Sequence, residues 1–251
     1  PTPANTNNGM NLFSNYAPDP QSSLTAGFYI APVSVQISGS FNSNIHYTTD
    51  GSIPEITSTL YTNPLSITQT MVVRAVNISN LPDVLPSDVI TNTYLINYHT
   101  ALPVFSIATH PDNLWDWNTG IYVAGPNASP VYPYYGANFW QNWEIETHIE
   151  FFETDGSRKI SQNAGVEIHG GTSNRSKPMK SLRLSAKNKY GTDNFEHRFF
   201  AQKNILSFKN IVLRNSSFDF NKTHFRDGSL HELMIGTLNI DLEGYRPAAV
   251  F

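Results

Sequence analysis

The segment from residue 175 to residue 189 is the one local stretch of this sequence that would attract an anion. It contains six basic residues and no acidic residue: Arg175, Lys177, Lys180, Arg183, Lys187 and Lys189. The preceding Gly170-Gly171 pair is typical of a turn between two strands. The stretch lacks the Gly-Lys-Ser/Thr ending of a Walker loop and the G-x-G-x-x-G spacing of nucleotide loops. The sequence therefore excludes these two loop types and leaves the basic side chains as the candidates.

Lys180 is the basic residue whose position indicates a specific role. It is in phase with Leu182 and Leu184 on one face of the strand that opens here. A lysine on the inward face of a strand needs an anionic partner, which is either a carboxylate or a bound phosphate. A structural salt bridge, or a lysine whose ammonium reaches the surface, is an equally good interpretation. Arg183 has the opposite phase, so we expect it in solvent.

A second candidate group lies on the strand expected at residues 145–152. Its alternation places Glu146, His148 and Glu150 on one face. Two carboxylates that flank an imidazole could bind a divalent metal ion. The same three residues are also typical of a solvated sheet face, and we favour that interpretation.

An aromatic segment between residues 115 and 143 contains all four tryptophans, Trp115, Trp117, Trp140 and Trp143. Exposed Trp and Tyr rings have flat apolar faces and polar edges, which suit a carbohydrate or a protein partner. The alternative is a loop that packs over its own aromatic core. We favour the alternative, because a loop of this length must be tied down by something.

Composition excludes several classes of protein. The 251 residues include 16 Lys and Arg against 20 Asp and Glu, for a net charge of −4. No global positive field is present, so we expect no nucleic-acid partner. No run approaches the ~18 apolar residues of a membrane span, so we expect no membrane insertion. The absence of cysteine excludes disulfides, thiolate zinc sites and cysteine nucleophiles.

The charges are divided unevenly along the chain. Residues 1–99 hold one basic residue, Arg74, and five acids, whereas residues 100–251 hold fifteen charges of each sign. This change predicts a domain boundary near His99. We therefore expect an N-terminal extension at residues 1–21, a first module at residues 22–98 and a second domain at residues 99–251.

The first module has the pattern of short strands. Val33, Val35 and Ile37 alternate with polar residues, and similar runs follow at residues 45–49, 64–67, 71–76 and 89–96. Turn residues such as Asp50-Gly51-Ser52 separate the runs. Several short strands without a credible helix predict an antiparallel β-sandwich.

Those residues also resemble a known family. The run from Ile45 to Pro54, with Tyr61, Pro64, Ile67 and residues 72–76, is similar to the small immunoglobulin-like module at the C-terminus of chitobiases and hexosaminidases. The resemblance covers roughly residues 22–97. It implies an accessory, fibronectin-like domain in an exported and often polysaccharide-associated protein. In this module Asp50 is expected to cap a turn, in which Gly51 supplies a positive φ.

The second domain has a different pattern. A strand is expected at residues 102–107, a short helical turn at residues 111–115, and a hairpin from residue 145 to residue 160 with Asp155-Gly156 at its turn. A later helix is predicted by apolar residues at helical spacing, Phe225, Leu230, Leu233 and Met234. Asn221 or Thr223 is the expected N-cap of this helix.

Three passages of the second domain resemble the spore-coat-protein-H (CotH) kinase family. They are residues 143–156, residues 165–184 and residues 213–227, which include the runs GVEIHGGTS, KPMKSLRL and LRNSS. The resemblance covers about residues 102–251 and implies an atypical protein kinase with a reduced kinase-like fold that uses ATP and Mg²⁺.

The resemblance also implies roles for individual residues. Lys180 matches the lysine that faces the nucleotide phosphates, and Arg226 and Asp227 match an Arg-Asp pair at the start of the following helix. Asp227 or Glu232 would be the acidic partner of the lysine. An aspartate that serves the positive end of the helix is an equally good interpretation of Asp227.

The expected fold class is mainly β plus α+β: an N-terminal antiparallel sandwich followed by an incomplete kinase-like α+β domain. Family members place the metal-binding and catalytic aspartates well after the strand that begins near Arg246, so we expect them beyond Phe251. We therefore expect a fragment that is inactive by itself.

In the intact protein, the expected activity is ATP-dependent phosphorylation of Ser/Thr-rich surface proteins. The alternative function is a non-catalytic extracellular adhesion or polysaccharide-binding protein, with a cell-surface polysaccharide as its partner. Both interpretations place the protein outside the bacterial cell, either secreted or on the surface.

Overall fold

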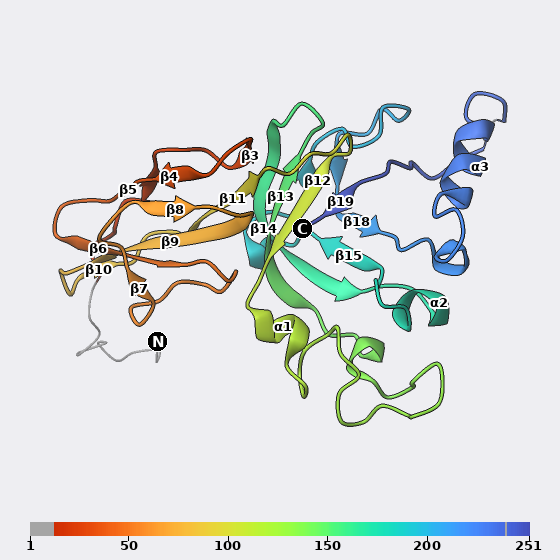
Figure 1. Cartoon of the computed structure of the whole chain (residues 1–251), viewed down its shortest axis with the longest axis horizontal. Helices are drawn as coiled ribbons and strands as arrows, with labels where there is room; N and C mark the ends of the chain where they lie inside the picture. Colours follow the sequence, from red (N-terminus) through yellow and green to blue (C-terminus); the bar gives the residue numbers. More distant parts are fainter. Residues whose placement is uncertain (1–12, 239) are drawn as a thin grey trace, which may run out of the picture. The chain divides into compact units, whose positions relative to one another are not determined.

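The computed structural model describes residues 13–238 and 240–251. It divides the chain into two compact units, Pro1–Tyr98 and His99–Phe251 (Figure 1). Of the expected N-terminal extension, residues 1–12 lie outside the described residues. The remainder is part of the first unit, because β1 (Asn15–Tyr16) pairs with β10 (Val84–Leu85) and β2 (Gln21–Ser22) pairs with β5 (Ile37–Ser38).

The larger sheet of the first unit has five strands in the order β3-β11-β9-β6-β7. The strands are β3 (Gly27–Tyr29), β11 (Ile90–Ile96), β9 (Met71–Ser79), β6 (Ser43–Thr48) and β7 (Thr59–Leu60). The residues that pack against this sheet come from three other strands. They are β4 (Val33–Val35) and β8 (Leu65–Ile67), which pair with each other, and β5. Their side chains share one core with the larger sheet: Val35, Ile37, Ile45, Ile67, Val73, Ala75, Tyr94 and Ile96.

This arrangement is the two-layered β structure that the alternating sequence predicts, with one difference. The pairs β1–β10 and β3–β11 are parallel, so the unit is mixed rather than purely antiparallel. The predicted strand at residues 33–37 is also interrupted at Gln36, which separates β4 from β5.

The turn at Asp50 is confirmed. Its carboxylate accepts hydrogen bonds from the Ser52 backbone N–H at 3.0 Å and from the Ser52 hydroxyl at 2.6 Å, and Gly51 has a φ of +90°. The buried Arg74 donates to the Gly51 carbonyl at 3.0 Å and to the Thr91 hydroxyl at 3.2 Å. The one basic residue of this unit therefore ties the turn to the sheet.

The second unit is built on a six-stranded sheet in the order β18-β15-β14-β13-β12-β19. Its strands are β18 (Asn210–Leu213), β15 (Leu182–Ser185), β14 (Arg158–Ile168), β13 (Ile145–Phe152), β12 (Val104–Ala108) and β19 (Ala249–Val250). All neighbours are antiparallel except β12 and β19. The predicted hairpin is β13–β14, with Gly156 at a φ of +81° in its turn.

One face of this sheet carries the main core of the second unit. Its fully buried residues include Ile149, Phe151, Val166, Leu184 and Phe195. The remaining elements are short: α1 (Pro111–Trp115), η1 (Asn138–Trp140), α2 (Thr172–Arg175), η2 (Asn188–Tyr190), β16 (Phe195–Glu196), β17 (Ser207–Phe208), η3 (Ser217–Asp219) and α3 (Arg226–Met234). In Figure 1, α3 lies beyond the β15–β18 edge of the sheet.

The last segment of the chain returns to the sheet as β19. Arg246 donates to Glu153 Oε1 at 2.9 Å and makes a second, shorter contact with Oε2. His197 Nε2 lies 2.7 Å from the same carboxylate. Because Arg246 and its neighbours line the cavity described next, this ion pair fixes one wall of the candidate site.

Candidate functional site

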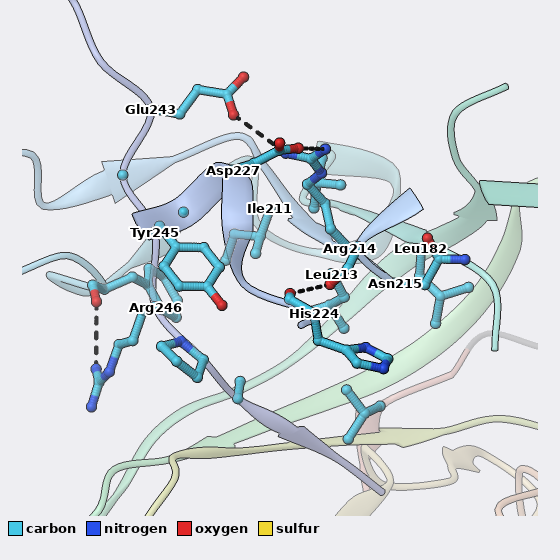
Figure 2. Close-up of a pocket in the computed structure, with 18 of the residues that line it drawn as sticks. Leu182, Ile211, Leu213, Arg214, Asn215, His224, Asp227, Glu243, Tyr245 and Arg246 are labelled. Carbon is cyan, nitrogen blue, oxygen red and sulfur yellow. Dashed lines mark hydrogen bonds and ion pairs between the residues drawn. The ribbon is translucent and has the colours of Figure 1, made fainter. Parts of the chain in front are cut away.

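A cavity of about 650 Å³ lies between the β15–β18 edge of the sheet, α3 and the segment 243–250 (Figure 2). Apolar side chains form much of its lining: Leu182, Phe199, Phe200, Ile211, Leu213 and Tyr245. Charged side chains join them: Lys180, Arg214, Asp219, Arg226, Asp227, Glu243 and Arg246. A concave lining that combines apolar surface with polar groups is typical of a small-molecule site; this one is unusually rich in charged groups.

The cavity brings Lys180 together with the adjacent pair Arg226 and Asp227, which lies far from it in the sequence. Lys180, Arg226 and Asp227, which the CotH resemblance selects as nucleotide-binding residues, all line it. Arg226 and Asp227 begin α3, as expected. Lys180 lies two residues before the first residue of β15 instead of within the strand.

The surroundings of Lys180 differ from the expectation of an anionic partner. Its buried ammonium donates to the carbonyls of Arg175 at 2.8 Å and Lys177 at 3.0 Å. The ammonium also lies 4.1 Å from the ring centroid of Phe139, as in a cation–π contact. Burial lowers the pKa of Lys180 to about 8. Among the described residues no carboxylate pairs with Lys180, because backbone carbonyls and an aromatic face satisfy its charge. The phosphate partner stays a prediction.

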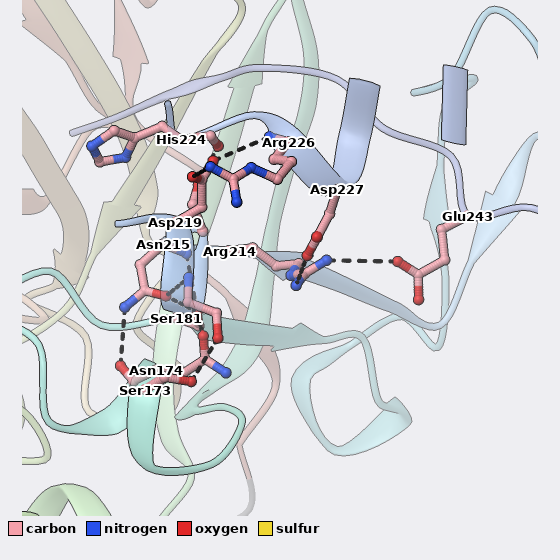
Figure 3. A network of polar contacts seen from close by, with 12 residues as sticks. Ser173, Asn174, Ser181, Arg214, Asn215, Asp219, His224, Arg226, Asp227 and Glu243 are labelled. Carbon is pink, nitrogen blue, oxygen red and sulfur yellow. Dashed lines mark hydrogen bonds and ion pairs between the residues drawn. The ribbon is translucent and has the colours of Figure 1, made fainter. Parts of the chain in front are cut away.

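Asp227 contacts a different cation. It accepts a hydrogen bond from Arg214 Nη2 at 2.8 Å, and Glu243 lies 3.8 Å from Arg214 Nη1 (Figures 2 and 3). Glu232, the other predicted partner of Lys180, accepts from Gln202 at 2.6 Å. Neither acid therefore holds Lys180.

Sequence reasoning missed Arg214 as a candidate. The residue follows β18 directly, so the end of the strand presents it at the sheet edge. Its side chain is 42% exposed, and its one hydrogen bond within the described part of the chain is the bond to Asp227. The sequence feature that could have identified Arg214 is its position as a charged residue directly after the apolar run 211–213.

The N-terminus of α3 is occupied by a carboxylate of the chain itself. Asp219 accepts from the backbone N–H of Arg226 at 3.2 Å and of Thr223 at 3.3 Å, and it also bonds the Thr223 hydroxyl. The guanidinium of Arg226 lies 3.3 Å from Asp219 Oδ1 (Figure 3). The hydrogen bond from the Thr223 hydroxyl is the main reason that the pKa of Asp219 is lowered.

The predicted caps of α3 are wrong. The N-cap is Phe225, which makes no side-chain capping bond, and Asp219 performs the capping from outside the helix. The apolar residues that predicted this helix, among them Phe225, Leu230 and Leu233, are exposed rather than packed in a core.

A polar network supports the floor of the cavity behind Arg214. The buried Asn215 accepts from the Ser181 hydroxyl at 2.9 Å and donates to the carbonyls of Met179 at 2.6 Å and Asn174 at 3.1 Å (Figure 3). Ser173 and Ser217 share a hydrogen bond of 2.6 Å. The network joins the segment 173–181 to the segment 215–217, so the two walls are held in register.

Gly228 on α3 packs directly against the Tyr245 ring of the segment 243–250. A Cβ atom on the buried Gly228 would lie 2.4 Å from the Tyr245 ring. No other residue type fits this contact without displacement of the ring. Glycine disfavours a helix, but packing requires it at this position.

The expected face of Glu146, His148 and Glu150 is not solvated throughout. Glu146 is exposed, but His148 and Glu150 are buried. His148 lies 2.8 Å from Asn163 Oδ1, and Arg158 donates to Glu150 at 2.6 Å. Within residues 13–238 and 240–251 there is no group of three His, Cys, Asp or Glu side chains that could hold a metal ion.

The four tryptophans of the aromatic segment have different surroundings. Trp140 is half-buried, donates to the Pro133 carbonyl at 2.9 Å and packs against a small core that contains Ile121, Ala137, Phe139 and Ile168. Trp115, Trp117 and Trp143 are exposed. The segment therefore has a core of its own, as we favoured, and also presents aromatic rings on its surface.

Comparison with known proteins gives one match. The family model described as the chitobiase/beta-hexosaminidase C-terminal domain matches residues 24–83. No curated protein and no solved structure matches the chain. The resemblance of the first unit to this accessory module is therefore confirmed over residues 24–83, whereas the CotH resemblance stays a prediction.

None of the helices in the described part of the chain has the length and apolar character needed to cross a membrane.

Proposed function

We propose that residues 99–251 form the nucleotide-binding part of a secreted or surface protein kinase of the CotH type, which transfers phosphate from ATP to Ser/Thr-rich surface proteins. One observation carries the proposal: Lys180, which both its strand phase and the resemblance select, lines one cavity with Arg226 and Asp227, which the resemblance selects. The match of the first unit to a module of chitobiases and hexosaminidases supports an extracellular, carbohydrate-rich setting.

The chemistry of the lining supports a nucleoside triphosphate as the ligand. Leu213 and Tyr245 offer apolar surface to a base, and Arg214 and Arg226 offer half-exposed guanidinium groups to phosphate. Arginine presents five N–H donors in a planar fork that matches phosphate oxygens. Each of these two arginines already has a carboxylate partner, so a phosphate would share the guanidinium through its remaining donors.

Lys180 has a different part in this proposal. Its ammonium would have to exchange a carbonyl, either that of Arg175 or that of Lys177, for a phosphate oxygen. Its two hydrogen bonds to these carbonyls stabilise the conformation of residues 175–180, which form one wall of the cavity. We therefore assign the first phosphate contacts to the arginines.

Mg²⁺, when bound with ATP, neutralises phosphate charge and the charge that develops in phosphoryl transfer. The described residues provide no cluster that could hold it by protein ligands alone. We assign no residue of this chain to the metal ion and derive no step through it.

The test is a calorimetric titration of ATP into the chain, with Arg226→Met as the variant. Lys187→Met is the matched control, because Lys187 is paired with Glu144 and lies outside the cavity lining. We expect saturable binding to the unmodified chain, roughly tenfold weaker binding to Arg226→Met (about 1.4 kcal/mol) and unchanged binding to Lys187→Met. The absence of saturable binding, or equal losses in both variants, would contradict the proposal.

A further inference from the structure

Two exposed tryptophans lie two residues apart in the sequence at the end of α1. Trp115 is the last residue of the helix, Trp117 follows the C-cap residue Asp116, and both side chains are 57% exposed. Full burial of a large apolar side chain typically stabilises a protein by about 1.5–3 kcal/mol. Because both rings are more than half exposed, each contributes only part of that free energy to the stability of this fold. Large apolar rings grouped on a surface are typical of an interaction site.

The backbone that carries these rings is held rigidly. Asp116 accepts from the backbone N–H of Asn118 at 2.9 Å and of Thr119 at 2.8 Å, and from the Thr119 hydroxyl at 2.9 Å. These bonds, led by the one from the Thr119 backbone, lower the pKa of Asp116. The turn after α1 is therefore closed by a carboxylate that is ionised at neutral pH.

The side chain of Asn138 also holds the turn after α1. The buried Asn138 donates to the Trp117 carbonyl at 3.2 Å and to the Gly120 carbonyl at 3.1 Å. The Trp115 ring lies 5.1 Å from the Tyr122 ring, at an interplanar angle of 58°. Both tryptophans thus extend from a preorganised framework, which lowers the entropic cost of binding a partner.

The charge of residues 110–143 indicates which kinds of partner could bind the two tryptophans. Residues 110–143 contain two acids, Asp112 and Asp116, and no Lys or Arg. The segment itself therefore offers no cation to a phosphorylated, sulfated or uronate-rich polymer. The nearby Lys180 and Arg175 are already held by backbone carbonyls. A neutral sugar ring presents a flat C–H face to an indole and hydroxyls to polar neighbours such as the exposed Asn118.

We propose that Trp115 and Trp117 form a binding surface for a neutral polysaccharide with equatorial hydroxyls, of which chitin and cellulose are the probes of choice. The surface belongs to the second unit, and the lining of the nucleotide cavity includes neither tryptophan, although it includes Tyr122, against which Trp115 packs. A protein partner is the competing interpretation, and the test separates the two.

The experiment measures depletion of the whole chain from solution by insoluble chitin and by amorphous cellulose. The same chain is titrated with chitohexaose and cellohexaose while its tryptophan fluorescence is recorded. We expect retention on at least one polymer, a loss of roughly tenfold in affinity for Trp115→Ala and for Trp117→Ala, and no retention of the double alanine variant. The double phenylalanine variant should recover part of the affinity, because it keeps flat rings at both positions.

Two controls make the result specific. Phe41→Ala removes a ring that is 93% exposed in the first unit, and it should leave retention unchanged. Asp116→Ala keeps both indoles but opens the turn, so it should weaken retention less than the double alanine variant does. Retention should persist at 0.5 M salt, since ring stacking is not screened as charge pairing is.

Three outcomes would overturn the proposal. They are no retention of the unmodified chain on either polymer, full retention of a folded double alanine variant, and retention that disappears at 0.5 M salt. The first of these, if accompanied by capture of a protein through Trp115 and Trp117, would assign the surface to a protein partner. ATP titration of the double alanine variant should match that of the unmodified chain, so failure here is distinguishable from failure of the nucleotide site.

Discussion

Asp227 on α3 accepts a hydrogen bond of 2.8 Å from Arg214 Nη2 at the end of β18. The contact joins the helix to the edge of the sheet in the lining of the cavity, and Glu243 approaches the same guanidinium at 3.8 Å from the third wall. One arginine therefore lies between two carboxylates that come from different segments. In the nucleotide site that we propose, Arg214 is one of the two arginines that a phosphate would share.

We expect Arg214→Met to weaken ATP binding by tenfold or more while it changes the free energy of unfolding little. The ion pair with Asp227 is about half exposed, and such pairs contribute about 0–1 kcal/mol to stability. Arg214→Lys should keep the charge but lose the forked geometry. Its affinity for ATP should therefore lie between that of the unmodified chain and that of Arg214→Met. Calorimetry and urea denaturation of the three proteins check this prediction, and an unchanged affinity for Arg214→Met would assign the phosphate to other residues.

Lys180 should make stability depend on pH in the alkaline range. Burial lowers its pKa from 10.5 to about 8, so between these values the unfolded chain binds more protons than the folded chain. Linkage then requires the free energy of unfolding to rise with pH across that window. The rise should be on the order of 2 kcal/mol, at about 1.4 kcal/mol for each unit of pKa difference.

The measurement for Lys180 is urea denaturation at pH 7.5, 8.5 and 9.5. Lys180→Met should lose this rise, because methionine has no proton to release. Equal pH slopes for the two proteins would show that the ammonium is not in the buried position described here.

Glu153 should make stability depend on pH in the acid range. The hydrogen bond from Arg246 is the main reason that the pKa of Glu153 is lowered from 4.5 to about 2. A lowered carboxylate pKa stabilises the fold above pH 4.5, and this contribution is lost as the pH falls from 4.5 toward 2. Its size is at most roughly 3 kcal/mol.

Glu153→Gln should therefore be less stable than the unmodified chain at pH 7 and close to it near pH 2. Denaturation midpoints at pH 7, 4 and 2.5 measure the difference. If the stability difference between the unmodified chain and Glu153→Gln is the same at all three pH values, the ion pair with Arg246 does not cause that difference.

Gly228→Ala should destabilise the second unit, although alanine favours a helix by about 1 kcal/mol. The added Cβ would lie 2.4 Å from the Tyr245 ring, so the ring must move. Gly171→Ala is the matched control, since a Cβ there meets nothing within 4 Å. Thermal unfolding should show a lower midpoint for Gly228→Ala alone, and Tyr245→Ala should restore it in the double variant. A raised midpoint for Gly228→Ala would refute the close contact.

The elements with a clear period were predictable from the sequence. The alternation of apolar and polar residues at 145–152, followed by Asp155-Gly156, predicts the hairpin β13–β14, and the structure has it. Both signals are local, so they do not depend on the rest of the fold. The core of the first unit was predictable for the same reason, and only the parallel pairs of β1 and β3 were not, because pairing direction depends on distant segments.

The candidate site was less predictable, because side-chain direction depends on tertiary contacts. Lys180 has the phase of Leu182 and Leu184, but the strand begins only at Leu182, and the carbonyls of Arg175 and Lys177 lie within reach of its ammonium. Asp219, which caps α3, is seven residues before the residue whose N–H it accepts from. No local pattern encodes such a contact.

The most direct test of the central claim is a titration of the isotopically labelled chain with ATP, followed by amide chemical shifts in two-dimensional NMR. The cavity proposal predicts saturable shift changes at the lining segments 179–182, 211–216, 224–231 and 243–250. It predicts no saturable changes at residues 13–98 or at Lys187. Saturation without changes at the lining, or no saturable change anywhere, would contradict the assignment of a nucleotide to this cavity.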